Sequence, residues 1–205
     1  MLIAYNPLMF DQIKTKLPHL AARLDAFAAK YQRLELPART VLLKEGEVSR
    51  RSFYVEKGCL RVWFNNNGKD ITFQFAFEDQ VVSSADSFIK GAPSLFTIES
   101  IEPCIVRWVH KEDFDIFMKE LYEVPELREF FMNAVFERQF HYMRLFLSFI
   151  KDTPTQRYVN LIKEQPLVVQ RVPQHYIASY LGITPVSLSR IRNKLLKDKS
   201  SGFIS

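Results

Sequence analysis

The stretch "YIASYLGITPVSLSRIRNKL", residues 176–195, predicts two short helices joined by a sharp turn at Gly182. Pro173 can occupy the first turn of a helix over Gln174–Leu181. Glycine at position 182 ends that helix, because it can take the left-handed conformation that a tight turn requires. Thr184 and Pro185 are then the residue types that favour the N-cap and the first position of a second helix.

The two predicted helices have distinct buried and exposed sides. Ile177 and Leu181 lie one turn apart on the inner face of the first helix, and Ala178 is small enough to let another helix approach. The buried stripe of the second helix is Leu188, Ile191 and Leu195. Its remaining surface carries Ser187, Ser189, Arg190, Asn193, Lys194 and Lys197. This is the helix-turn-helix layout, whose second helix can enter the major groove of B-DNA.

The basic charge of the chain is concentrated around this motif. Residues 151–205 contain nine Lys and Arg against three Asp and Glu, a net charge of +6. Since the whole chain carries +5, the first 150 residues have a net charge of −1. A near-neutral body with a basic end indicates a polyanionic partner. The alternatives are a solvated basic face that maintains solubility and an ordinary corner of two helices packed in a core.

A long helix is predicted over Pro125–Ile150. Five apolar residues of this helix have the spacing of a coiled-coil seam: Phe136, Phe140, Met143, Leu147 and Ile150. A second apolar stripe on a neighbouring face consists of Phe131, Val135, Tyr142, Phe146 and Phe149. A helix that is apolar on two faces must be covered on two sides. The β-rich segment of the same chain, residues 34–109, can cover one side. A twin helix is the simplest cover for the other, so we expect a homodimer. The alternative is burial within one chain.

The segment from about Leu34 to Val109 has the pattern of short strands and turns. Its clearest hairpin joins Leu60–Phe64 to Ile71–Phe77 through "NNNGKD", where Asn and Gly tolerate the positive backbone angles of such turns. The phenylalanines at positions 73, 75 and 77 alternate with other residues, which predicts that their rings share one face of a half-buried strand. Many short strands favour a closed or double-layered antiparallel roll.

Helical and extended segments flank these regions. Phe10–Arg33 is predicted to be helical, with a break at Pro18. Thr153 and Pro154 form an N-cap and first-position pair that starts a further helix. The stretch "PLVVQRVP", residues 166–173, predicts a short strand or an extended link between two prolines.

Composition and motifs argue against several other classes of protein. No run approaches the roughly 20 apolar residues of a membrane-spanning helix, and the N-terminal residues lack the pattern of a secretory signal, so we expect a cytoplasmic protein. Cys59 and Cys104 are too few for a disulfide scaffold, and each is predicted to be a small buried hydrophobe. A metalloenzyme on a β-roll needs several converging histidines, and only His110 lies near the strands. No glycine-rich phosphate loop or nucleophile elbow is present, so we expect no enzyme.

Residues 177–195, "IASYLGITPVSLSRIRNKL", resemble the helix-turn-helix of the Crp/Fnr regulators, the family of the catabolite activator protein. The likeness extends through "LKEGE" and "VEKGCLRVWF" in the roll and "PTQRYVNLI" before the motif. It implies a bacterial α+β protein with an antiparallel β-roll similar to the cyclic-nucleotide-binding jelly roll, a long dimerisation helix and a winged helix-turn-helix. The corresponding domains would be residues 1–124, 125–150 and 151–205. Only the first wing strand fits "SSGFIS", so a truncated wing is expected.

The resemblance also implies how DNA would be read. Two recognition helices of a homodimer would enter successive major grooves, about 34 Å apart, on a near-palindromic operator. Arg190 matches an arginine that reads guanine, Ser189 matches a serine of the fumarate–nitrate regulator branch, and Ser187 and Thr184 should reach phosphates. Val186 replaces the glutamate that accepts from cytosine in many relatives, so the operator should differ. The complete set expected at DNA is Gln174, Thr184, Pro185, Val186, Ser187, Ser189, Arg190, Asn193 and Lys194.

Four effector-pocket positions correspond to Ser83, Ser84, Ser94 and Leu95 in this resemblance. Relatives that bind cyclic AMP hold its phosphate there with Gly-Glu and Arg-Ser pairs. Without the arginine, the phosphate charge would lack a partner in a desolvated pocket, so we expect no tight binding of cyclic AMP.

Some members of the family that this chain resembles use an iron–sulfur cluster or a haem. The iron–sulfur branch needs four cysteines, and Cys59 and Cys104 alone cannot supply them. Haem ligation by His19, His110 or His141 is an open alternative, although a lone histidine is more often a structural or surface residue. No cofactor or metal is therefore expected, and the effector is unidentified.

Two classes of function follow. The favoured one is a sequence-specific DNA-binding transcriptional regulator, whose roll either senses an unknown small molecule or contacts RNA polymerase. The alternative is a small-molecule-binding or interaction protein whose helical end only mediates dimerisation and has no affinity for DNA.

Overall fold

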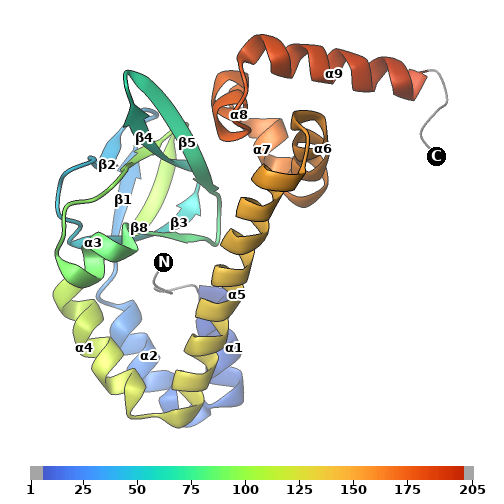
Figure 1. Ribbon diagram of the computed structural model, residues 1–205. Coiled ribbons are helices and arrows are strands. Elements are labelled where there is room, and N and C mark those ends of the chain that lie inside the picture. Colours follow the sequence, from blue (N-terminus) through green and yellow to red (C-terminus); the bar gives the residue numbers. More distant parts are fainter. Residues whose placement is uncertain (1–6, 201–205) are drawn as a thin grey trace. The chain divides into compact units, whose positions relative to one another are not determined.

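The structure is a computed structural model that describes residues 7–200 (Figure 1). The chain forms two compact units. The first contains the residues up to Phe64 together with Phe75–Tyr142, and the second contains Asn65–Gln74 together with the residues from Met143 onward.

The chain folds into a roll of two four-stranded sheets, which belongs to the first unit apart from Asn65–Gln74 at the tip of one hairpin. One sheet has the order β1 (Gln32–Leu36), β8 (Cys104–His110), β3 (Arg51–Lys57) and β6 (Val81–Val82). The other has the order β2 (Val41–Leu43), β7 (Thr97–Ser100), β4 (Leu60–Asn66) and β5 (Lys69–Ala76). β8 pairs antiparallel with β1 and β3, and β7 pairs antiparallel with β2 and β4. The predicted double-layered antiparallel roll is confirmed.

The β4–β5 hairpin turns at Asn67 and Gly68, whose φ angles are 53° and 83°. Two successive positive φ angles are the conformation that Asn-Gly favours in tight hairpins. The turn is shorter than predicted, because the strands continue to Asn66 and resume at Lys69. The prediction of a half-buried strand is wrong for β5: Phe75 and Thr72 both lie below 6% exposure although they point to opposite faces. Both faces of this strand are covered at Thr72, Phe75 and Ala76, whereas Ile71, Phe73 and Gln74 are half-buried.

A buried ion pair crosses the second sheet. Arg61 stands opposite Glu99 in the β4–β7 register, and Arg61 Nη2 lies 3.5 Å from Glu99 Oε2. Trp63 Nε1 donates to the same carboxylate over 2.8 Å. Buried charges are tolerated when they are paired and hydrogen-bonded, as here.

Gly58, just before β4, has φ 101°, and an added Cβ would lie 2.6 Å from Cys104 Sγ, so this position requires glycine.

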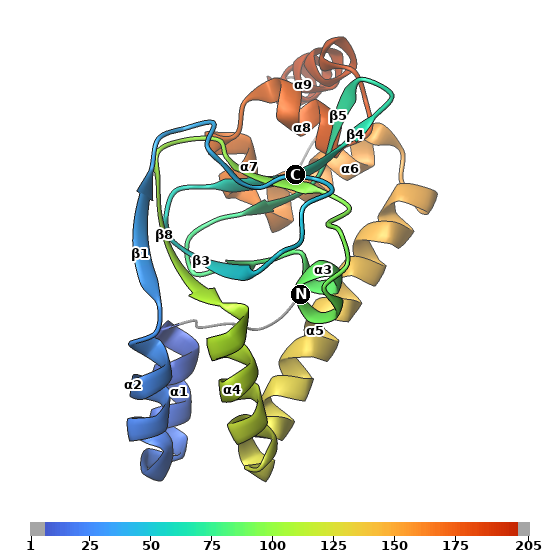
Figure 2. The same ribbon diagram turned by 90° about the vertical axis from the view of Figure 1, so that its left-hand side faces the viewer.

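Helices gather at one end of the roll, as both views show (Figures 1 and 2). They are α1 (Pro7–Lys16), a 3₁₀ turn (Pro18–Leu20), α2 (Ala21–Ala28), α3 (Ala85–Lys90), α4 (Lys111–Tyr122) and the beginning of α5 (Pro125–Lys151), whose residues from Met143 onward belong to the second unit. Their apolar core includes Phe10, Leu24 and Phe114, all nearly inaccessible to solvent. The predicted break at Pro18 is confirmed. The predicted helix to Arg33 is wrong at its end, because Gln32 and Arg33 pair with β8 instead.

The second unit contains the helices α6 (Pro154–Glu164), α7 (Pro166–Arg171), α8 (Gln174–Tyr180) and α9 (Pro185–Ser200). Thr153 and Gln156 form a reciprocal capping box that starts α6, as the sequence predicts. The predicted strand or link over residues 166–173 is wrong, since this segment forms α7. Pro166 occupies its first turn, where a missing N–H costs nothing, and Val168 is completely buried. The predicted wing strand lies beyond Ser200, outside the described residues.

None of the helices that the structure describes combines the length and apolar character needed to cross a lipid bilayer.

Candidate nucleic-acid interface

The turn at Gly182 ends α8 with the two hydrogen bonds of a Schellman motif. The N–H of Gly182 donates to the carbonyl of Ser179, and the N–H of Ile183 donates to that of Ala178, each over 3.0 Å. The φ of Gly182 is 68°, a region that costs a residue with a side chain about 1–2 kcal/mol. Steric room is not the constraint, because an added Cβ would meet only Phe149 Cε1, at 3.5 Å. The predicted glycine turn is confirmed.

The start of α9 is also as predicted. The hydroxyl of Thr184 accepts a hydrogen bond from the N–H of Ser187 over 3.1 Å, and Pro185 is the first residue of the helix. The two hydroxyl oxygens of Thr184 and Ser187 lie 2.9 Å apart. An N-cap of this kind stabilises a helix by about 1 kcal/mol.

The two helices pack through the predicted inner positions. Leu188 is completely buried, and Ile177, Ala178 and Leu181 of the facing segment are at most 2% exposed. Ile191 and Leu195, predicted for the same stripe, are only half-buried. Leu188 is therefore the main apolar anchor of α9.

The opposite side of α9 is open to solvent. Val186, Arg190 and Asn193 share this face, because they follow one another at four- and three-residue spacing. Most of the side chains that are predicted to reach DNA are exposed: Gln174, Thr184, Pro185, Val186, Ser189, Arg190, Asn193 and Lys194. Ser187 is half-buried beside Thr184. Exposed Lys197 continues the face four residues after Asn193, and this spacing identifies it as a member of the surface.

A second contact of α8 has no signal in the sequence. The hydroxyl of Ser179 accepts a hydrogen bond from the N–H of Thr72 over 2.9 Å and donates to the carbonyl of Asp70 over 2.8 Å. The β4–β5 hairpin tip therefore belongs to the same compact unit as the helix-turn-helix. Nothing in the local pattern around Ser179 distinguishes it from a solvent-facing helical serine.

α5 carries a continuous exposed apolar stripe. The exposed fractions of the predicted seam are 50% for Phe136, 44% for Phe140, 50% for Met143, 37% for Leu147 and 66% for Ile150. The second stripe is divided: Phe131 is buried in the core, whereas Phe146 is 66% exposed. Large contiguous apolar surfaces of this kind usually mark interaction sites.

The four predicted effector-pocket positions differ in burial. Ser83, Ser84 and Ser94 are each at most 4% exposed, and the hydroxyl of Ser94 lies 2.9 Å from that of Ser84. Leu95 is 72% exposed and does not join them. Lys90, the single cation between positions 83 and 95, has a largely exposed side chain paired with Asp86. The serine cluster therefore offers hydroxyl groups and no buried cation within this segment.

The cysteines behave as predicted. Cys59 and Cys104 are free thiols at 0% and 3% exposure, and burial raises the pKa of the Cys104 thiol. Across residues 7–200, no three His, Cys, Asp or Glu side chains gather in a way that could hold a metal ion.

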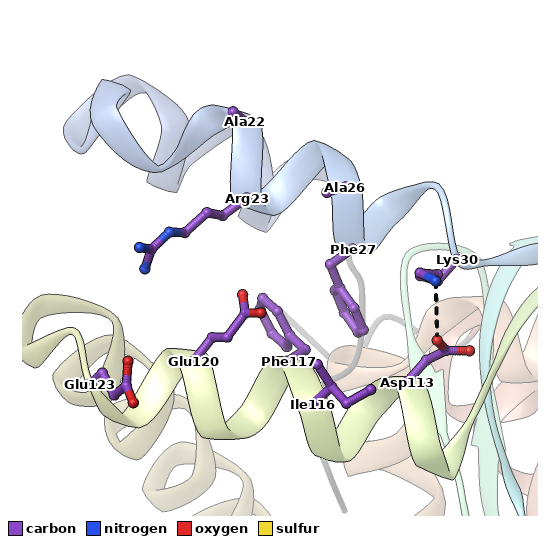
Figure 3. A pocket seen from close by; sticks show the side chains of 10 residues that line it. All are labelled: Ala22, Arg23, Ala26, Phe27, Lys30, Asp113, Ile116, Phe117, Glu120 and Glu123. Carbon is purple, nitrogen blue, oxygen red and sulfur yellow. Dashed lines mark ion pairs between the residues drawn. The ribbon is translucent and has the colours of Figure 1, made fainter.

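A groove of about 570 Å³ lies between α2 and α4 (Figure 3). Phe27 and Phe117 stack in its floor with ring centroids 3.9 Å apart, and Lys30 pairs with Asp113 across it over 3.5 Å. Figure 3 shows Arg23 extending from α2 and Glu120 from α4 over the same hollow. None of the predicted effector-pocket residues lines this groove.

Comparison of the sequence with known families matches the roll, whereas comparison with curated proteins finds no match. Residues 33–120 match the family model of the cyclic nucleotide-binding domain, a span from β1 through most of α4. No curated protein sequence matches the chain.

Solved structures share the fold over most of the chain. The c-di-GMP-responsive global regulator CLP of Xanthomonas campestris has a TM-score of 0.68 at 17% identity, covering 87% of this chain and 93% of that one. FixK2 of Bradyrhizobium japonicum has a TM-score of 0.68 at 16% identity, covering 82% and 86%. The catabolite activator protein of Thermus thermophilus has a TM-score of 0.52 at 16% identity, covering 87% and 84%. This chain therefore shares the fold of these proteins over most of its length.

Proposed function

We propose that the protein is a sequence-specific DNA-binding transcriptional regulator of the Crp/Fnr type. The observation that carries the proposal is the orientation of α9. Leu188 anchors one face against α8, and the opposite face presents Arg190 and Asn193 to solvent. An exposed arginine on a helix of this diameter can make the bidentate contact to guanine O6 and N7.

Charge on α9 supports the same proposal. Arg190, Lys194 and Lys197 are exposed, and Asp198 is the only acidic residue within Pro185–Ser200. Phosphate neutralisation by such residues releases counterions, so affinity should fall log-linearly with salt. The c-di-GMP-responsive regulator CLP shares this fold, which agrees with a regulatory role.

The regulator would act as a homodimer held along α5. An isolated chain would leave the rings of Phe136 and Phe140 about half exposed to water. Burial of apolar area contributes about 25 cal/mol per Å², so pairing with a second α5 removes an unfavourable surface. A dimer would present two copies of α9 to a near-palindromic operator.

The roll would not hold cyclic AMP tightly. The buried serines at positions 83, 84 and 94 offer hydroxyls, whereas a desolvated phosphate requires a charged partner. A different small molecule, or RNA polymerase, would be the partner of the roll.

Selection of bound duplexes from a random pool tests the central proposal. We expect a near-palindromic consensus with guanine at the position that Arg190 reads. Arg190→Ala should weaken binding to the selected operator by about 1–3 kcal/mol and spare random-sequence duplexes. Lys163→Ala, which removes an exposed charge on α6, is the matched control and should leave operator preference unchanged. Equal losses on operator and random duplexes for Arg190→Ala would refute base recognition.

The dimer is tested by sedimentation. The wild type should sediment at twice the chain mass of 24.1 kDa. Phe140→Glu should shift it toward the monomer, because a carboxylate on the seam costs free energy when buried. His141→Glu adds the same charge at an exposed site off both stripes and should preserve the dimer. A monomeric wild type would refute dimerisation along α5.

A further inference from the structure

One side chain in the second unit joins two helix ends. Arg157, in the first turn of α6, donates from Nη1 to the carbonyl of Asp152 over 2.9 Å. It also donates from Nη2 to the carbonyl of Leu181 over 3.0 Å. Its guanidinium carbon lies 5.0 Å from the centroid of the Phe149 ring.

The two carbonyl groups belong to helix C-termini. Asp152 directly follows α5, and Leu181 is the C-cap of α8, immediately before Gly182. The last carbonyls of a helix have no partner within the helix and carry partial negative charge. A guanidinium satisfies both needs, because it is cationic and its planar fork can donate to two acceptors at once.

The Phe149 ring completes this junction. It lies in the last turns of α5, under the guanidinium, and its Cε1 atom is the nearest neighbour of an added Cβ at Gly182. The end of α5 and the turn that leads into α9 are therefore packed around Arg157. Arg157 is half-buried and engaged on three sides, so it is not arranged as a phosphate contact.

We propose that Arg157 is a positioning residue that sets the direction of α9 relative to the last turn of α5. This inference rests on the proposed function, since in a dimer joined along α5 that direction decides the separation of the two copies of α9. Arg157 therefore determines which half-site spacing the protein accepts. One base pair displaces a half-site by about 3.4 Å and rotates it by about 35°, so a rigid junction should reject shifted spacing.

The test compares full-length wild type, Arg157→Gln and Arg157→Lys on synthetic duplexes. One series carries two selected half-sites at the preferred spacing and at spacings changed by one or two base pairs. Another duplex carries a single half-site. Lys163→Gln, which removes one positive charge from the same helix, is the matched control.

We expect the wild type and Lys163→Gln to lose about tenfold in affinity for each shifted duplex, in line with 1.4 kcal/mol per decade. Arg157→Gln should bind the single half-site within about threefold of the control, because its α9 surface is intact, but should discriminate spacings by less than about threefold. Arg157→Lys should also lose discrimination, since an ammonium group lacks the planar fork. A residue that merely stabilised the fold would weaken all duplexes equally.

Retained spacing discrimination in both Arg157 variants would overturn the inference and leave the proposed function intact. Absence of operator-specific binding by the wild type would overturn the proposed function itself. If circular dichroism shows that Arg157→Gln has lost helix, the decision rests on Arg157→Lys, for which retained discrimination would overturn the inference equally.

Discussion

Truncation of the apolar anchor of α9 is the sharpest test of how the helix-turn-helix is held together. Leu188 is completely buried, so Leu188→Ala removes three carbon groups from the core of the second unit. At about 0.8 kcal/mol for each buried group, the lost transfer free energy is about 2.4 kcal/mol. The cavity left behind adds to this loss, and comparable leucine truncations span about 2.7–5 kcal/mol. We therefore expect a loss of about 3 kcal/mol in the local stability of α8 and α9.

Leu196 provides the matched control. It lies two turns further along the same helix and is 63% exposed, so Leu196→Ala should cost less than about 1 kcal/mol. Native-state hydrogen exchange is the suitable measurement, because it reports the opening of α8 and α9 separately from the roll. A loss of 3 kcal/mol corresponds to an increase of about a hundredfold in the exchange rates of these amides.

Comparison of Leu188→Ala with Leu196→Ala tests whether Leu188 anchors α9. Leu188→Ala should also weaken operator binding, since the open form of α9 is not competent to bind. Equal exchange rates in the two variants would refute the assignment of Leu188 as the anchor. A loss below 1 kcal/mol for Leu188→Ala would do the same.

Three further predictions concern the glycine turn, the hairpin contact of α8 and the buried thiols of the roll. Gly182→Ala should destabilise the second unit by about 1–2 kcal/mol in chemical denaturation, because its φ of 68° disfavours a side chain; an unchanged midpoint would contradict this. Ser179→Ala should remove two hydrogen bonds, worth about 0.5–1.5 kcal/mol each, and speed the exchange of the Thr72 amide; unaltered Thr72 protection would show that the hairpin contact does not form in solution. Cys59 and Cys104 should resist alkylation in the native protein. Because the pKa of the buried Cys104 thiol is raised, stability should decline as pH rises above about 8.5, where the unfolded thiol ionises first; rapid labelling at neutral pH would argue against this burial.

Features set by a few neighbouring residues were predictable from sequence. The glycine turn, the cap at Thr184 and the hairpin turn at Gly68 all depend on backbone preferences of one or two residues. The exposure of Arg190 and Asn193 followed from the period of the buried stripe around Leu188. These local preferences hold whatever the rest of the chain does.

Errors arose where neighbours in space overrode a local pattern. Two flanking prolines suggested an extended segment, yet Pro166 starts α7, because burial of Val168 favours a helix that a proline at the first position tolerates. Alternation in β5 suggested one solvated face, yet Thr72 is buried as fully as Phe75.

The sequence by itself determined the two helices around Gly182, the caps that begin them and the side of α9 that faces solvent. Only the tertiary structure revealed what holds this motif in place. Ser179 contacts Asp70, which lies 109 residues away in the sequence, and Arg157 contacts Leu181, which lies 24 residues away. Dihedral and capping energies act within a few residues and leave a readable pattern, whereas these contacts depend on the path of the whole backbone and leave none.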